Sequence, residues 1–179
     1  NRSSGKMGYA LAENAAASGA DVTLVHGPVS LADIPGIEMV ETVTADEMAT
    51  EVLKRYGEAD VVIMAAAGAD YRPEKFYVKK SDGDWNLRLV RNVDILKLLG
   101  ERKTRQKLVG FAAETENLLE NAQNKLIEKN VDLLVANDVS RTDVGFGSDE
   151  NEVFLLFKNG RKKKISKTSK ERIAQDILS

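Results

Sequence analysis

Strand-like and helix-like patterns alternate along this chain, and this alternation is the feature that most restricts its fold. Short aliphatic and β-branched runs are followed by segments with helical spacing of apolar residues. The run 59–70 is largely apolar without alternation, and the run 107–114 precedes a helical segment at 117–129. Such runs are typical of parallel strands covered on both faces. The pattern predicts an α/β fold with a three-layer, doubly wound, Rossmann-like and mostly parallel sheet.

The last third of the chain predicts an antiparallel hairpin at the edge of this sheet. Asn159-Gly160 lies between two strand-like runs within 152–166, and this dipeptide is a strong signal for a tight hairpin turn. No linker-like stretch divides the chain, so we expect one domain over residues 1–179. Because a strand feeds the first phosphate-binding turn of this fold, we also expect an N-terminally truncated domain whose first strand is missing from this chain.

Several boundaries are predicted from turn and capping residues. Thr44 and Glu47 form a capping-box pattern that begins a helix ending near Gly57. The same pattern in Thr168 and Glu171 predicts the cap of the last helix. The polar stretch 71–84 is expected to be a loop, and 85–91 a strand.

Composition excludes several classes of protein. Lys and Arg number 26 against 28 Asp and Glu, which gives a net charge of −2 and lacks the basic excess of a general nucleic-acid binder. There is no cysteine, and His26 is the single histidine, so thiolate and multi-histidine metal sites are excluded. No apolar run approaches the roughly 20 residues of a membrane span. We therefore expect a cytoplasmic protein with neither nucleic-acid nor membrane partners.

The stretch Ser3–Gly5, followed by a helical segment, predicts an anion site, because a helix N-terminus attracts phosphate. Two known phosphate-binding motifs, the P-loop and the dinucleotide-binding turn, each match it only in part. A P-loop needs a hydroxyl where Met7 stands, and a dinucleotide turn needs a further glycine beyond Gly5 and Gly8. The next strand, which ends "LVHG", also lacks the acid that binds ribose. Close helix–sheet packing is the alternative role for the two glycines.

Five segments carry a family resemblance: "NRSSGKMGYALA", "VTLVHGPVSL", "AAAGADYRPEK", "GFAAETEN" and "KNVDLLVANDV". Together, and in this order, they resemble phosphopantothenoylcysteine synthetase of the bacterial, CTP-dependent type. The resemblance implies a ligase of coenzyme A biosynthesis that joins 4′-phosphopantothenate to L-cysteine. CTP would be cleaved to CMP and pyrophosphate through an acyl-cytidylate, with Mg²⁺ as cofactor.

The resemblance also implies a homodimer, for which the hairpin edge offers a surface, and possible fusion to a phosphopantothenoylcysteine decarboxylase. FMN would be present only with that upstream domain. Two alternatives stay open: an NAD(P)-binding reductase on the same fold, and a nucleotide-binding module without catalysis.

Site residues follow from the resemblance position by position. Asn1 would donate to the acyl-cytidylate carbonyl, and Lys75 would close over the nucleotide, so both are assigned to catalysis. Phosphopantothenate would be bound by Asn1, Ser3, Ser4 and Gly5. CTP would be bound by Ala65, Ala66, Ala67, Asp70, Lys75, Arg91, Asn92, Val93, Phe111, Lys125 and Lys129.

Each assignment has a plainer alternative. Asn1 could cap a helix, the three alanines could pack tightly within a strand, and Phe111 could belong to the core. Lys79 and Lys80 follow Lys75 and would fill the family's further loop lysines, although their spacing fits less closely. Lysines are usually exposed, which is the alternative for the two helical lysines and for this loop pair. The family's usual lysine-asparagine-proline-aspartate stretch is Arg91 to Asp94 here, with Val93 in place of the proline. Asn137 lies at the end of another predicted strand. The residues that would bind Mg²⁺ are unknown.

Overall fold

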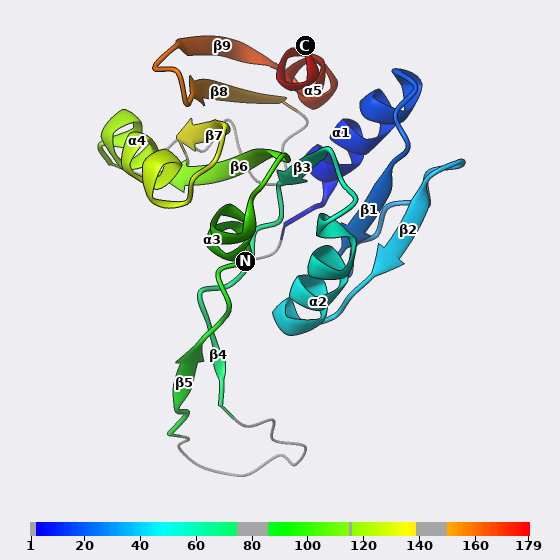
Figure 1. Ribbon diagram of the computed structural model, residues 1–179, viewed down its shortest axis with the longest axis vertical. Helices are drawn as coiled ribbons and strands as arrows, with labels where there is room; N and C mark the ends of the chain where they lie inside the picture. The colour runs from blue at the N-terminus through cyan, green and yellow to red at the C-terminus, as the bar shows by residue number, and fades with distance from the viewer. Residues whose placement is uncertain (1–2, 75–85, 115, 139–149) are drawn as a thin grey trace.

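The computed structural model describes residues 3–74, 86–114, 116–138 and 150–179 (Figure 1). Its largest sheet has five strands in the order β3-β6-β7-β8-β9. These are β3 (Val61–Met64), β6 (Lys107–Glu114), β7 (Leu133–Asp138), β8 (Glu150–Phe157) and β9 (Lys162–Ser169). The first three are parallel, and β8 and β9 are antiparallel to their neighbours. The predicted mostly parallel sheet with an antiparallel edge hairpin is confirmed.

A second, two-stranded parallel sheet holds β1 (Thr23–His26) and β2 (Glu38–Glu41). Within the described ranges, β1 and β3 are not hydrogen-bonded to one another. That a first strand belongs between them stays a prediction.

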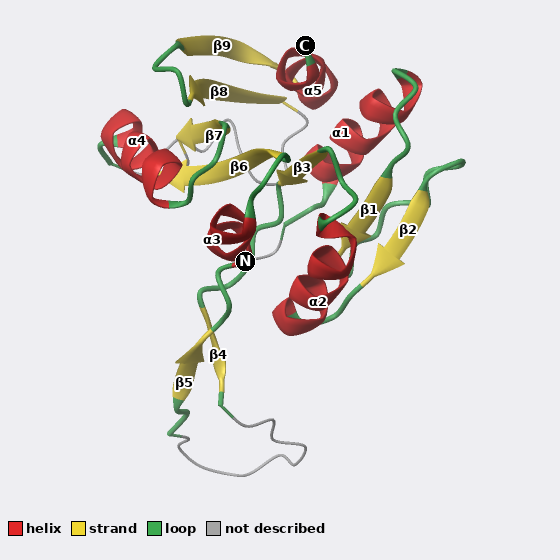
Figure 2. Cartoon of the chain, in the orientation of Figure 1, coloured by secondary structure: helices red, strands yellow, loops and turns green. Residues whose placement is uncertain are grey.

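Helices cover both faces of the main sheet (Figure 2). On one face, buried residues of the sheet pack with α2 (Ala45–Tyr56), α3 (Ile95–Arg102) and α4 (Leu118–Glu128). On the other face lie α1 (Lys6–Ala17) and α5 (Lys170–Leu178), which pack side by side. Neighbouring residues of β6 point to opposite faces: Leu108 joins the first core and Val109 the second. Both faces are thus buried, as the apolar runs predicted.

Helix boundaries follow the capping chemistry of the sequence, with one correction. Thr44 Oγ1 accepts from Glu47 N–H at 3.1 Å and Glu47 Oε2 accepts from Thr44 N–H at 3.1 Å, so the predicted capping box is confirmed. The prediction that Thr168 caps the last helix is wrong. Strand β9 continues to Ser169, whose hydroxyl accepts from Arg172 N–H at 3.3 Å and caps α5.

Two predicted strands are shorter than expected, and one predicted loop begins with a strand. The run 59–70 is a strand only over Val61–Met64, and within the described residues 86–91 the strand covers Leu89–Arg91, which is β5. Tyr71–Pro73, at the start of the expected loop, is β4 and pairs antiparallel with β5. The β4–β5 arm projects from the rest of the domain (Figure 1). The hairpin turn at Asn159-Gly160 is confirmed, with a φ of 86° at Gly160.

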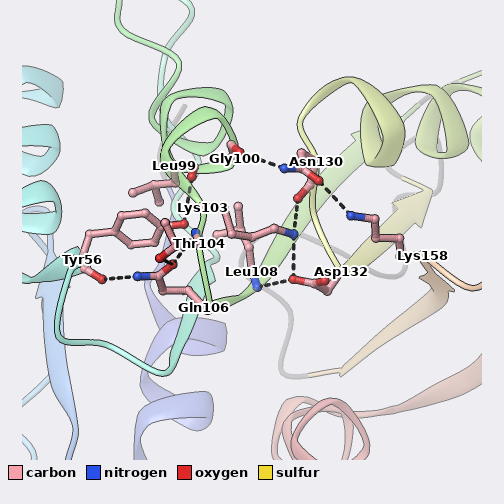
Figure 3. A network of polar contacts seen from close by, with 10 residues as sticks. All are labelled: Tyr56, Leu99, Gly100, Lys103, Thr104, Gln106, Leu108, Asn130, Asp132 and Lys158. Atoms are coloured by element: carbon pink, nitrogen blue, oxygen red, sulfur yellow. Dashed lines mark hydrogen bonds and ion pairs between the residues drawn. The ribbon is translucent and has the colours of Figure 1, made fainter.

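A polar network ties the amino-terminal ends of β6 and β7 to α3 (Figure 3). Lys103 Nζ donates to Asn130 O at 2.6 Å and forms an ion pair with Asp132 at 3.0 Å. Asp132 also accepts from Leu108 N–H at 2.8 Å. Burial opposes ionisation of Asp132, but these donors outweigh it and hold its pKa below its usual value. The network fixes the turn that follows α4.

Candidate functional site

The carboxyl end of β3 lies next to the start of α1. Met64 pairs with Gly110, so the parallel register continued by one residue places Ala65 beside Phe111. Ala65, Phe111 and Met7 pack around the same small core that holds Ala10. Ligands of open α/β sheets bind at such strand ends. The predicted turn therefore lies close to two of the predicted nucleotide-binding residues, Ala65 and Phe111.

The opening turn has the backbone that an anion site requires. Gly5 adopts a left-handed φ of 76°, and a Cβ at this position would lie 2.8 Å from Val29 Cγ1. Ser3 Oγ accepts from Gly5 N–H at 3.4 Å, no side chain caps α1, and its first turn carries no acid. The positive end of α1 is thus not neutralised by a carboxylate of its own first turn. Ser4 is half-buried in this turn, whereas Asn1 lies outside the described residues.

The alanine segment leaves the sheet where the nucleotide was predicted to lie. Strand β3 ends at Met64, so the alanines follow the strand, and Ala65 still packs against the core. Ala65 and Ala67 are half-buried and Ala66 is exposed. The exposed Asp70 follows at the base of the arm.

Asn92 holds the two strands of the arm together at their base. Its backbone N–H donates to Asp70 O at 2.8 Å, and its Nδ2 donates to Ala69 O at 2.7 Å. Arg72 donates to Asn92 Oδ1 at 3.3 Å and to Arg91 O at 3.1 Å. The contacts bring together two segments predicted separately from the sequence.

Sequence analysis missed the anchoring role of Arg72. In addition to its bonds within the arm, its guanidinium forms an ion pair with Asp46 of α2 at 3.2 Å. The side chain of Arg91, which was predicted to bind CTP, lies over the Tyr71 ring at 5.5 Å. Val93 is 37% exposed. Arg72 therefore connects the arm to the domain, while Arg91 contacts the arm itself.

Lys129 extends to the start of α3. Its ammonium lies 2.9 Å from Asp94 Oδ2, although its backbone lies just past the end of α4. Asp94 Oδ1 accepts from Lys97 N–H at 3.0 Å and caps α3. Burial raises the pKa of Asp94, but the bonds from Lys97 and Lys129 outweigh that effect and leave the pKa below its usual value. Lys129 is therefore an ordered cation and not a freely solvated surface lysine.

Lys125 is a second ordered cation, because an ion pair also holds its side chain. Its Nζ lies 2.6 Å from Oε1 of Glu114, the last residue of β6. The Glu114 side chain is 11% exposed, compared with 42% for Lys125. Sequence analysis did not assign Glu114, although an acid at the carboxyl end of a parallel strand was a signal for it.

Phe111 is half-buried, and Asn137 is buried. Phe111 packs against both apolar clusters on the α1–α5 face, so it has the core role that was weighed for it. Asn137 is 9% exposed and lies in register between Ala113 of β6 and Val153 of β8. Lys75, Lys79 and Lys80 lie outside the described residues.

The arrangement can bind a polyanion. The first turn of α1 carries no acid, and two lysine ammonium groups extend from the C-terminal end of α4. The described ranges contain no group of three His, Asp or Glu side chains that could hold a metal ion. No helix in those ranges is long and apolar enough to cross a bilayer.

Comparison with known proteins identifies the family. Residues 1–179 match the "DNA/pantothenate metabolism flavoprotein C-terminal domain". The chain belongs to this family. It is 48% identical over 182 residues to the coenzyme A biosynthesis bifunctional protein CoaBC of Bacillus subtilis, and 42% identical over 183 residues to that of Haemophilus influenzae. Each alignment covers at least 99% of this chain. The resemblance predicted from the sequence is confirmed.

A solved structure supports the same assignment. The crystal structure of the C-terminal domain of a CoaBC protein matches with a TM-score of 0.85 and 43% identity, covering 99% of this chain and 81% of that one. The chain spans 45% of the length of the Bacillus relative. The similarity therefore concerns the C-terminal part of a bifunctional protein.

Proposed function

We propose that the chain is a phosphopantothenate–cysteine ligase that uses CTP in coenzyme A biosynthesis. One observation supports it most: the two family lysines, Lys125 and Lys129, are both held in place by ion pairs, with Glu114 at the end of β6 and with Asp94 at the start of α3. A triphosphate needs such fixed cations, because negative charge develops on its leaving group. Relatives named for coenzyme A biosynthesis support the pathway.

In the proposed reaction, the 4′-phosphopantothenate carboxylate attacks the α-phosphate of CTP and pyrophosphate leaves. The cysteine amine then attacks the carbonyl of the acyl-cytidylate, which releases CMP and forms the amide. Lys125 and Lys129 stabilise the triphosphate, and Asp70, Asn92 and the alanine segment contact the nucleotide. Ser3, Ser4 and Gly5 bind phosphopantothenate. Asn1 and Lys75 have the catalytic roles implied by the resemblance.

Magnesium is proposed to enter with the nucleotide. The described residues offer no three-ligand cage, and Mg²⁺ is commonly held by substrate phosphates with only one or two carboxylates. Bound there, it would neutralise charge on the triphosphate. Lys125 and Lys129 would also neutralise charge on the triphosphate.

The partners are proposed from the relatives and from the surface. We infer cytoplasmic location, and fusion to a flavin-dependent decarboxylase as in bifunctional relatives, with FMN only in that domain. We also infer a homodimer. The β4–β5 arm, with Tyr71 49% and Leu89 56% exposed, offers a more apolar surface for pairing than β9, where Lys163 and Lys164 form surface ion pairs. Light scattering of wild type and Leu89→Glu tests this surface, because the variant is expected to be monomeric.

The function is tested by thermal melts of the full-length protein with CTP, ATP or NADPH, each with Mg²⁺. A ligand that binds only the folded state raises its stability, so CTP is expected to raise the Tm well above the effect of ATP. CMP release must also depend on both phosphopantothenate and cysteine. A shift with NADPH alone would support a reductase and refute the ligase.

Two variants test the catalytic assignments. Asn1→Asp is expected to slow CMP release while CTP still raises the Tm. Lys75→Gln is expected to reduce turnover more than stability. Unchanged turnover in Lys75→Gln would remove that lysine from the mechanism.

A further inference from the structure

The two lysines of the candidate site are paired in opposite ways. In the Lys125–Glu114 pair the carboxylate is the buried partner, 11% exposed against 42% for the lysine. In the Lys129–Asp94 pair the lysine is the buried partner, 21% exposed against 44% for the carboxylate. An anion that approaches the two ammonium groups therefore competes with two different carboxylates.

Glu114 cannot readily lose its lysine. It is the last residue of β6, where its backbone is in register with β7, and its side chain is nearly enclosed. Removing the ammonium would leave a buried carboxylate without its cation, which is strongly unfavourable. A lysine ammonium has three N–H donors. Lys125 can keep one donor on Glu114 and use the others for a phosphate oxygen.

Asp94 can release its lysine at a lower cost. Its carboxylate is half-exposed, and its Oδ1 keeps the bond from Lys97 N–H that caps α3. Water can solvate Oδ2 when Lys129 turns to a phosphate. The Lys129 ammonium, which is the more enclosed partner, would then leave the Asp94 carboxylate for a phosphate. It would therefore not be left without an anion.

We propose that Glu114 is a positioning residue that fixes the Lys125 ammonium for triphosphate binding, whereas Asp94 competes with the triphosphate for Lys129. The inference rests on the proposed function of the same site. It assigns opposite effects to two carboxylates that each pair with a lysine. Neutralising Glu114 weakens CTP binding, and neutralising Asp94 leaves it equal or strengthens it.

The test uses the full-length protein and steady-state kinetics of CMP release, together with binding of inorganic tripolyphosphate. Glu114→Gln is expected to raise KM for CTP about tenfold and to weaken tripolyphosphate binding similarly, with kcat within about twofold. Asp94→Asn keeps a good helix cap, because Asn and Asp cap equally well. It is expected to leave KM unchanged or to lower it up to about threefold.

Glu128→Gln is the matched control. Glu128 also lies on α4 and pairs with Lys97 at 3.5 Å, but both side chains are largely exposed, at 62% and 46%. Its KM for CTP is expected to equal that of wild type. A Lys125→Gln background gives a second control: Glu114→Gln should add little to KM there, because its effect acts through Lys125.

The outcomes separate this inference from the function itself. If wild type neither binds CTP nor releases CMP, the proposed function fails. If wild type is active and Lys125→Gln raises KM, but Glu114→Gln does not, the positioning role is refuted while the ligase stands. An equal rise in KM from Glu114→Gln with and without Lys125 also refutes it. If Glu114→Gln does not fold, Glu114→Asp replaces it, and an unchanged KM in that variant contradicts the inference.

Discussion

Gly100, the single glycine of α3, is predicted to be poorly replaceable, because it lets the backbone after α4 approach the helix. A Cβ at Gly100 would lie 1.9 Å from Lys129 O and 2.8 Å from its carbonyl carbon. Ordinary contacts are at least 3.4 Å, so alanine at this position requires a backbone shift of more than an ångström. That shift would also stretch the 2.9 Å bond from Asn130 Nδ2 to Gly100 O.

The expected loss follows from these contacts. Overpacking costs about 1–3 kcal/mol, and the strained hydrogen bond about 1 kcal/mol. The better helix propensity of alanine offsets about 1 kcal/mol. Gly100→Ala should therefore lower the free energy of unfolding by about 1–3 kcal/mol, or the Tm by about 2–12 °C for a domain of this size.

Urea unfolding followed by circular dichroism measures this loss, with Gly8→Ala as the matched control. Gly8 lies in α1, and a Cβ there would meet no described atom within 4 Å. Alanine at Gly8 should raise the free energy of unfolding by up to about 1 kcal/mol. If Gly100→Ala were as stable as wild type, the close approach of α3 to the turn after α4 would be refuted.

Three further substitutions test the stability account. Thr44→Ala removes the cap of α2 and should cost about 1 kcal/mol in urea unfolding; an unchanged midpoint would show that the capping box contributes nothing. Tyr56→Phe removes the 2.8 Å bond to Leu99 O and should cost about 1–2 kcal/mol, whereas equal stability would mean that water replaces the hydroxyl. Asp132→Asn should destabilise at pH 7. Because the pKa of Asp132 is lowered on folding, its contribution is present above about pH 4 and is lost as the pH falls through the folded pKa. The difference in free energy of unfolding between wild type and Asp132→Asn should therefore be smaller at about pH 3 than at about pH 7. A difference that stays constant would contradict this explanation.

Local chemistry made much of the fold predictable from the sequence. The strand 107–114 was predicted with the bounds that β6 has, because both faces of this run are apolar and polar residues flank it. The Asn159-Gly160 turn and the Thr44–Glu47 capping box depend on residues close in the chain, and both were predicted correctly.

Contacts between distant residues were not predictable in the same way. Tyr71–Pro73 becomes a strand through pairing with Leu89–Arg91, which no local pattern specifies. The partner of Lys125 is Glu114 on the preceding strand, and that of Lys129 is Asp94 on another helix. A helical spacing of four predicts that the two lysines share a face, but it does not predict which carboxylates they meet. The resemblance supplied the lysines, and the structure added their carboxylates.

At this site a carboxylate is proposed to be activated on the α-phosphate of CTP. Phosphopantothenate labelled with ¹⁸O in its carboxylate, turned over with CTP and cysteine and followed by mass spectrometry of the products, tests it most directly. The acyl-cytidylate route predicts one ¹⁸O in CMP and none in pyrophosphate. Label in inorganic phosphate together with CDP, or CMP without label, would contradict the proposed chemistry.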